Sequence, residues 1–161
     1  MANSTCISEF KNQVIDMITH NDTLFHAFDA KECANGRDLK DTHLFTYNKI
    51  PDTAAEAATY MTIMVNIKEQ EKNRTFITPT LEIWIYSHYK HMSMDKEITD
   101  DNRNDYISML LDKMFNGSAA LGGIGNLNLI LNEEGTFEKE FLYRHLIFQT
   151  TDINDSLCKG W

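Results

Sequence analysis

Two segments in the middle of the chain alternate between apolar and other side chains, and this alternation limits the possible folds more than any other feature. From Tyr60 to Lys68 every second residue is an aliphatic residue or methionine, and in the segment from Thr80 to His88 the same holds for Leu81, Ile83 and Ile85. A period of two is typical of a strand that buries one face. The polar run 69–74 follows the first segment. We therefore expect an antiparallel hairpin with an extended polar tip, a place where contact residues are common.

The second face of this hairpin is unusual because it is aromatic. Glu82, Trp84 and Tyr86 alternate with the aliphatic residues of the second segment. The first segment is apolar almost to its end, whereas an edge strand of a monomer is normally protected by charge, a bulge or a cover. Both observations favour packing against a helix or another subunit. Trp84 and Tyr86 are therefore candidate contact residues.

Helical periodicity occurs in three other places. Apolar residues spaced three and four apart predict a helix over residues 4–19 and a later helix whose apolar stripe occupies residues 106–115, and a shorter apolar set at 24–28 predicts one or two further turns. Residues 99–101 offer cap side chains to the later helix, and Asn116-Gly117 is expected to end it.

Three more segments are predicted to be extended. Residues 44–51 end in Ile-Pro, and a residue before proline is pushed towards the β region. Leucines alternate over 127–131, a turn is expected at 132–135, and a last strand is expected over about 138–150. The order helix, helix, strand, strand, helix, strand, strand predicts an α+β fold with an antiparallel sheet of about four strands, covered by helices on one side.

The length of 161 residues fits one domain, which we place at residues 1–154. Residues 155–161 form a polar tail that ends with Leu157 and Trp161. An aromatic tail of this kind can dock on a partner or return onto its own core, and the sequence favours neither.

The charge balance argues against a surface that grips nucleic acid. Fifteen Lys and Arg against 24 Asp and Glu leave a formal net charge of −9, so DNA would be repelled rather than held. No secretory signal or apolar membrane span is visible, and three unevenly spaced cysteines are expected to be reduced thiols in a cytoplasm. We therefore expect no membrane contact.

No motif indicates an enzyme, a cofactor or a metal. His88 and His91 would point to opposite sides of a strand and lack further ligands. The glycine-rich segment 117–125 follows a helix and lacks the Lys-Ser/Thr of a phosphate-binding loop. The acidic residues within 100–105 are explained by helix capping. We expect no catalytic residue, no cofactor and no bound metal.

Seven segments of the chain together carry a resemblance to known proteins. They are Ile50-Pro51-Asp52, Tyr60 to Lys68, Leu81 to His88, Arg103 to Ile107 leading a helix that stops at Phe115-Asn116-Gly117, Gly123 to Leu127, Tyr143 to Phe148, and Thr151 to Asn154. Their layout resembles that of small neck and tail-end proteins of tailed bacteriophages over about residues 44–154, and the polar insert 31–42 departs from it.

The family concerned is that of tail terminator or tail-completion proteins. The resemblance implies a virion protein, made in the host cytoplasm, that forms a homo-oligomeric ring, usually hexameric. Such a ring would end the tail tube and join it to the neck or connector proteins, and DNA would pass through its lumen without sequence-specific binding. The tip residues Lys72, Asn73 and Arg74 would reach a neighbouring subunit or the tail tube protein. The tail with Leu157 and Trp161 would reach the adjoining ring.

Three other functions stay open at this point. A head-to-tail connector or adaptor ring would share most of these features. An unrelated soluble α+β binding module, working as a monomer or dimer, would be distinguished by the absence of a ring. A small hydrolase would be favoured by a pocket with a perturbed titratable cluster.

Overall fold

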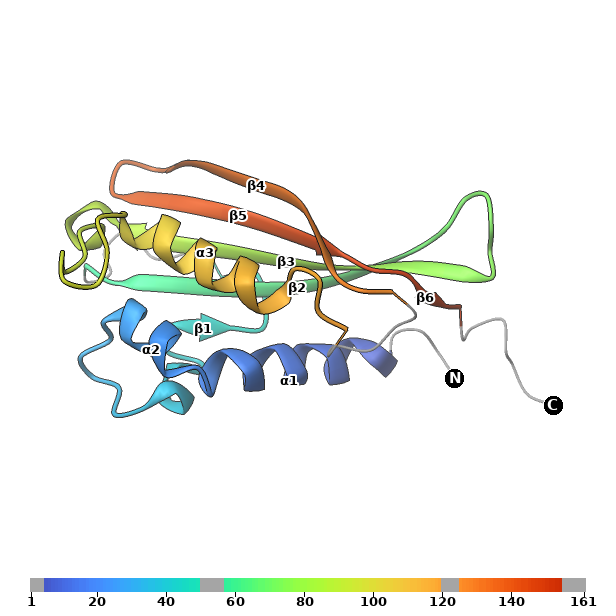
Figure 1. Ribbon diagram of the computed structural model, residues 1–161, viewed down its shortest axis with the longest axis horizontal. Helices are drawn as coiled ribbons and strands as arrows, with labels where there is room; N and C mark the ends of the chain where they lie inside the picture. Colours follow the sequence, from blue (N-terminus) through green and yellow to red (C-terminus); the bar gives the residue numbers. More distant parts are fainter. Residues whose placement is uncertain (1–4, 50–56, 120–124, 155–161) are drawn as a thin grey trace.

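One sheet of six strands organises the part of the chain described by the computed structural model, which comprises residues 5–49, 57–119 and 125–154. Helices pack on one of its faces, and the hairpin of its two longest strands projects from one end (Figure 1). The elements in chain order are α1 (Thr5–Thr19), α2 (Asp22–Phe28), the 3₁₀ helix η1 (Gly36–Leu39), β1 (Leu44–Phe45), β2 (Thr59–Glu69), β3 (Phe76–His88), the 3₁₀ helix η2 (Tyr89–His91), α3 (Arg103–Phe115), β4 (Asn128–Phe137), β5 (Phe141–Gln149) and β6 (Asp152–Ile153).

The strand order β1-β2-β3-β5-β4 confirms the predicted α+β class. The four expected strands are β2, β3, β4 and β5, and all their pairings are antiparallel. The structure adds two strands of two residues each. β6 extends the ladder of β3, and β1 pairs with β2 in parallel, so the sheet is mixed rather than purely antiparallel. A parallel pair needs a long connection, which the chain between β1 and β2 supplies.

The aliphatic face of the hairpin is buried under the helices, as the alternation predicts. Ile63 of β2 lies opposite Ile83 of β3, which lies opposite Leu146 of β5, and none of the three side chains is exposed. The apolar stripes of α1 and α3 close over this row. The core includes Phe10, Val14, Ile18, Leu24, Phe28, Met61, Ile63, Leu81, Ile83, Ile85, Ile107, Leu111, Phe115, Leu146 and Phe148.

The turn expected at residues 132–135 is wrong. β4 runs through this segment to Phe137, and the chain reverses at residues 138–140, where Glu138 has a φ of 54°. A β-bulge between Leu129 and Leu131 shifts the register, so the apolar alternation breaks and hides the continuation of the strand. Gly135 does not turn the chain: a Cβ there would lie 2.5 Å from the Tyr143 hydroxyl, so glycine is needed for close approach.

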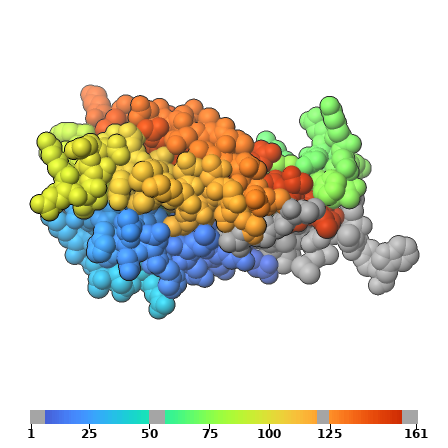
Figure 2. Space-filling model, in the orientation of Figure 1, coloured from blue at the N-terminus to red at the C-terminus, as the bar shows by residue number. Residues whose placement is uncertain are grey.

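β3 begins four residues earlier than expected because it tolerates Pro79. Thr80 pairs with Gln149 at the end of β5, and Ile77 pairs with Asp152 of β6. Pro79 lies in the gap between these two partners, where no ladder donor is needed, and its carbonyl accepts from the Thr150 N–H at 3.0 Å. The hairpin tip is therefore short, residues 70–75, and it lies on a long ribbon of β2 and β3, joined near the tip by β6, that stands out from the body in Figure 2.

The helix boundaries follow the predicted signals with one shift. α1 and α2 occupy the expected segments. α3 starts at Arg103, and its N-cap is Asn102, whose side chain accepts from the Asp105 N–H. Residues 99–101, which were expected to cap the helix, precede this position. Asn116-Gly117 ends it as predicted, with Gly117 at a φ of 79°.

Candidate functional site

The hairpin tip presents two cationic side chains on a backbone that is fixed at its base. Arg74 is 74% exposed in its side chain and pairs with Glu69 across the hairpin. Asn73 closes the turn by accepting from the Thr75 N–H at 3.1 Å. The Asn154 side chain donates to the Arg74 carbonyl at 2.8 Å, which ties the tip to the end of the described chain. The tip is thus an ordered projection with exposed side chains.

The sheet face opposite the helices, here called the outer face, carries a layer of stacked rings. The aromatic layer consists of Trp84, Tyr86, Phe137, Tyr143 and His145. Trp84 stacks on His145 with ring centres 3.8 Å apart, and it stacks on Tyr86 at 6.0 Å. Trp84 stays half-buried, whereas neighbouring rings leave Tyr86 only 4% exposed. This burial raises the pKa of Tyr86 to about 12.

Acidic side chains border this layer. Glu82 of β3 lies 3.5 Å from Nε2 of His145, and Glu133 of β4 lies 3.3 Å from its Nδ1. Tyr143 lies across Gly135 and so fills the surface towards the β4 edge. The aromatic layer therefore combines the half-buried rings of Trp84, Phe137 and Tyr143 with two buried rings, and it has an acidic border. Its rings come from strands alone, since the helices pack on the other face. Aromatic anchors with a polar rim are typical of protein interfaces.

A second candidate is a cavity of about 380 Å³ at the end of the sheet away from the tip. The residues that surround it come from the end of α2 and the loop after it, the segment before β1, the residues just before β2 and its start, and η2. They are Phe28, Asp29, Ala30, Lys31, Glu32, His43, Ala57, Ala58, Tyr60 and His91.

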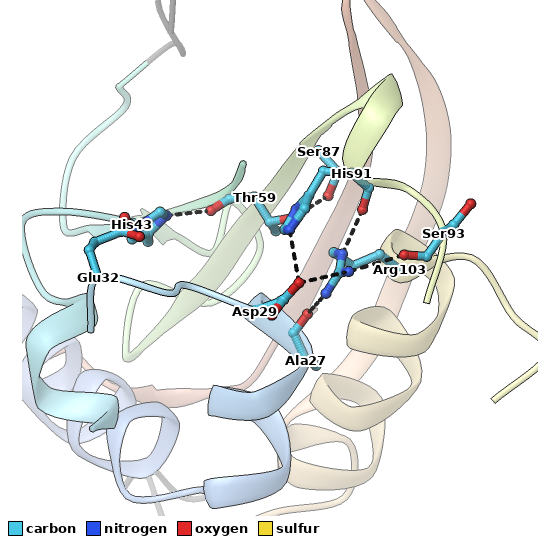
Figure 3. Close-up of polar contacts among 9 residues, drawn as sticks. All are labelled: Ala27, Asp29, Glu32, His43, Thr59, Ser87, His91, Ser93 and Arg103. Carbon is cyan, nitrogen blue, oxygen red and sulfur yellow. Dashed lines mark hydrogen bonds and ion pairs between the residues drawn. The ribbon is translucent and has the colours of Figure 1, made fainter. Parts of the chain in front are cut away.

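His43 forms one side of this cavity and is held by two acceptors. Its Nδ1 donates to the Thr59 carbonyl at 2.8 Å, and its Nε2 contacts the Glu32 carboxylate (Figure 3). A carbonyl oxygen can only accept, so Nδ1 carries a proton in the contact with Thr59. The hydrogen bond from His43 lowers the pKa of Glu32.

His91 forms the other side of the cavity and connects to buried hydroxyl groups. Its Nδ1 is 2.8 Å from Oγ1 of Thr59, which is 2.8 Å from Oγ of Ser87. Its Nε2 is 3.6 Å from the Asp29 carboxylate. Burial lowers the pKa of His91, and the positive charge of Arg103 lowers it further.

Arg103 acts as a clamp behind the cavity. Its guanidinium donates to the carbonyls of Ala27, His91 and Ser93, and it lies 3.8 Å from Asp29 (Figure 3). These bonds join the end of α2 to the chain before α3 and satisfy a carbonyl at the end of α2. Burial lowers the pKa of Arg103. The cluster therefore fixes three segments together.

The chain Asp29–His91–Thr59 has the order of an acid, a base and a hydroxyl, but its hydroxyl cannot act as a nucleophile. Thr59 and Ser87 both have no exposed surface, so a substrate in the cavity cannot reach either oxygen. Within residues 5–49, 57–119 and 125–154, no group of three metal-binding side chains gathers. In the same residues, no helix is long and apolar enough to cross a membrane.

The structure brings together some of the predicted contact residues. Trp84 and Tyr86 stack within the aromatic layer, and Lys72, Asn73 and Arg74 lie together at the tip, at the far end of the hairpin. Leu157 and Trp161 lie outside the described residues.

Sequence reasoning missed several residues of both candidate sites. The period-two series of aromatic residues in β5 could have predicted Tyr143 and His145 of the aromatic layer. No sequence signal joins Asp29, His91 and Arg103, which come from three separate loops or helix ends.

The family model named YomW matches residues 12–150. No curated protein matches the chain.

Proposed function

This chain belongs to the phage-associated YomW family, and on that premise we propose that it is a structural protein of the phage particle. In this proposal six copies of the chain form a ring that ends the tail tube and joins it to the neck. DNA passes through the lumen without specific contacts. The protein acts by binding other proteins and performs no catalysis.

The observation that carries this proposal is the aromatic layer on the outer face. A half-buried tryptophan stacked on His145, with an acidic border, is costly to leave in water and is suited to an interface. The ribbon of β2 and β3 supports the same view because it projects beyond the body and ends in Lys72 and Arg74. We expect this projecting ribbon to contact a neighbouring ring through the residues of its tip.

The acidic balance also supports a lumen protein. A net charge of −9 repels the phosphate backbone, so DNA can move past the ring without being held. The same features suit a head-to-tail connector ring, which differs in the ring that it touches.

The alternative of a small hydrolase draws on the cavity, whose Glu32 and His91 have shifted pKa values. Its weakness is the nucleophile, because both hydroxyl groups near His91 are buried. Arg103 and its three carbonyl partners give this cluster a structural role.

The experiment is the mass and shape of the purified protein, by light scattering after gel filtration and by negative-stain imaging, alone and with tail tubes. Rings, or capping of tube ends, support the proposal. A compact monomer that also leaves tube ends uncapped overturns it. Trp84→Ala should reduce assembly, whereas Tyr89→Ala, at an exposed ring outside the aromatic layer, is the matched control. Capping of the opposite, connector side would instead favour the connector ring.

A further inference from the structure

The sheet has two long open edges within the described residues. One is β4 from Leu131 onwards, since the N–H of Leu129 already donates to the Asn116 side chain at 3.1 Å. The other is the part of β2 beyond its short pairing with β1, residues 63–69, since β1 pairs only with Met61 and Thr62. The opposite side of the ribbon is covered, because β5 and β6 both pair with β3. An open edge offers unpaired N–H and C=O groups to another strand.

The hydrogen-bond pattern shows which residues offer these groups on β2. The Met61 N–H donates to the His43 carbonyl at 2.7 Å, on the side away from β3. In an antiparallel strand, backbone groups of successive residues point to alternate sides. Ile63, Val65 and Ile67 therefore direct their N–H and C=O groups to the open edge. Their side chains lie on the helix face with Met61, because they share its parity.

The same alternation carries across the sheet to β4. The Pro79 carbonyl accepts from the Thr150 N–H. The odd-numbered residues of β3 therefore direct their backbone N–H and C=O groups towards β5. Following the pairings through β5, residues 132, 134 and 136 of β4 direct their backbone groups outwards. Their side chains also lie on the helix face, where Asn132 donates to Ser108 of α3 at 2.9 Å.

We propose that β2 of one copy pairs with β4 of a second copy, so that a single antiparallel sheet continues from subunit to subunit. This rests on the ring proposed above and names its interface. β4 runs opposite to β2 within the sheet, so joining the two edges continues the antiparallel order. The two outward rows both carry their side chains on the helix face, so the helices of all copies stay on one side. A contact between two different edges is heterologous and can close a ring.

Charge selects this pairing over its alternatives. Glu133 and Glu134 have side chains that are 53% and 71% exposed, and they would repel a second β4. Lys68 is exposed and lies on the outer face, as does Glu133. A register with Lys68 opposite Glu133 places opposite charges together. It also aligns Ile67 with Glu134, both of which direct backbone groups to the shared edge.

Disulfide trapping tests the pairing directly. Lys68→Cys and Glu133→Cys are made in separate proteins of different mass, with the three native cysteines changed to serine. Directly opposed residues of an antiparallel pair are at disulfide distance. Mild oxidation of the mixture should give a mixed dimer at several times the yield of either homodimer. Equal or greater yields from Lys68→Cys alone or Glu133→Cys alone would overturn the proposal in favour of a symmetric β2–β2 or β4–β4 contact.

Charge reversal gives an independent test. Lys68→Glu should weaken assembly several-fold, and adding Glu133→Lys should restore it, while Lys96→Glu, at an exposed position in the loop between η2 and α3, serves as the matched control. Circular dichroism checks that each variant is folded. Rings without the mixed disulfide and without rescue would overturn this interface and leave the ring intact. A mixed disulfide in open filaments would support the interface and overturn the ring.

Discussion

The two faces of the sheet differ in chemistry although they are built from the same strands. The helix face is aliphatic, and α1, α2 and α3 cover it completely around Ile63, Ile83 and Leu146. The outer face is aromatic, and its rings cover one another. Aliphatic side chains gain stability from dense packing, whereas stacked rings with polar edges tolerate partial contact with water. The first face therefore holds the fold, and the second is suited to a partner.

The largest expected effect comes from the helix face. Ile83→Ala should lower the free energy of unfolding by about 3 kcal/mol, because it leaves a cavity in a packed core. Urea unfolding followed by circular dichroism measures this loss. A loss no greater than that of Trp84→Ala would contradict the division between the two faces.

Trp84→Ala, at the next position of β3, tests the outer face. We expect a loss of about 2 kcal/mol, since the ring is only half-buried and contributes mainly by stacking on His145 and Tyr86. Assembly should fall much more than stability does. Sedimentation of the variant against Tyr89→Ala measures the difference, and unchanged assembly would remove the aromatic layer from the interface.

Gly135→Ala tests how the outer face is closed near the β4 edge. The new Cβ would meet the end of the Tyr143 ring, which must move, so we expect a loss of about 1 kcal/mol and a changed tryptophan fluorescence. Gly125→Ala is the matched control because its Cβ would be at an ordinary 3.5 Å from Thr150. Equal effects of both substitutions would contradict the close approach at Gly135.

A pH titration tests the polar end of the helix face. The pKa of His91 is lowered from 6.5, so the unfolded chain takes up a proton first as the pH falls. Stability from this group is complete above about pH 6.5 and decreases as acidification proceeds below that value. Urea midpoints at several pH values should show a smaller decrease for His91→Gln than for the wild type. The exposed His26→Gln should behave like the wild type.

The smallest effect on stability is expected at the tip. Lys72→Glu combined with Arg74→Glu should change the free energy of unfolding by less than about 0.5 kcal/mol, because both residues are exposed. Capping of tail tubes should nevertheless weaken. Unchanged capping would show that the tip lies outside the contact.

Local signals predicted the parts of the fold that depend on near neighbours in sequence. The alternation in β2 and β3 predicted both strands and their buried face, and Asn116-Gly117 predicted the end of α3. The same reasoning failed at residues 132–135, because a bulge changed the register of β4 and because Gly135 leaves room for the Tyr143 ring of β5 instead of forming a turn. The sequence alone does not distinguish a glycine that forms a turn from a glycine within a strand that allows close approach of another side chain.

The sequence by itself determined the α+β class, the hairpin, and Trp84 and Tyr86 as members of one face, since a period of two or of 3.6 is a property of the local chain. Only the tertiary structure decided that His145 stacks on Trp84 and that Arg103 joins Ala27, His91 and Ser93. It also decided that, among the described residues, β4 and residues 63–69 of β2 lie at the open edges. These depend on contacts between residues far apart in the chain. Their partners are chosen by the order of the strands, which local periodicity does not encode.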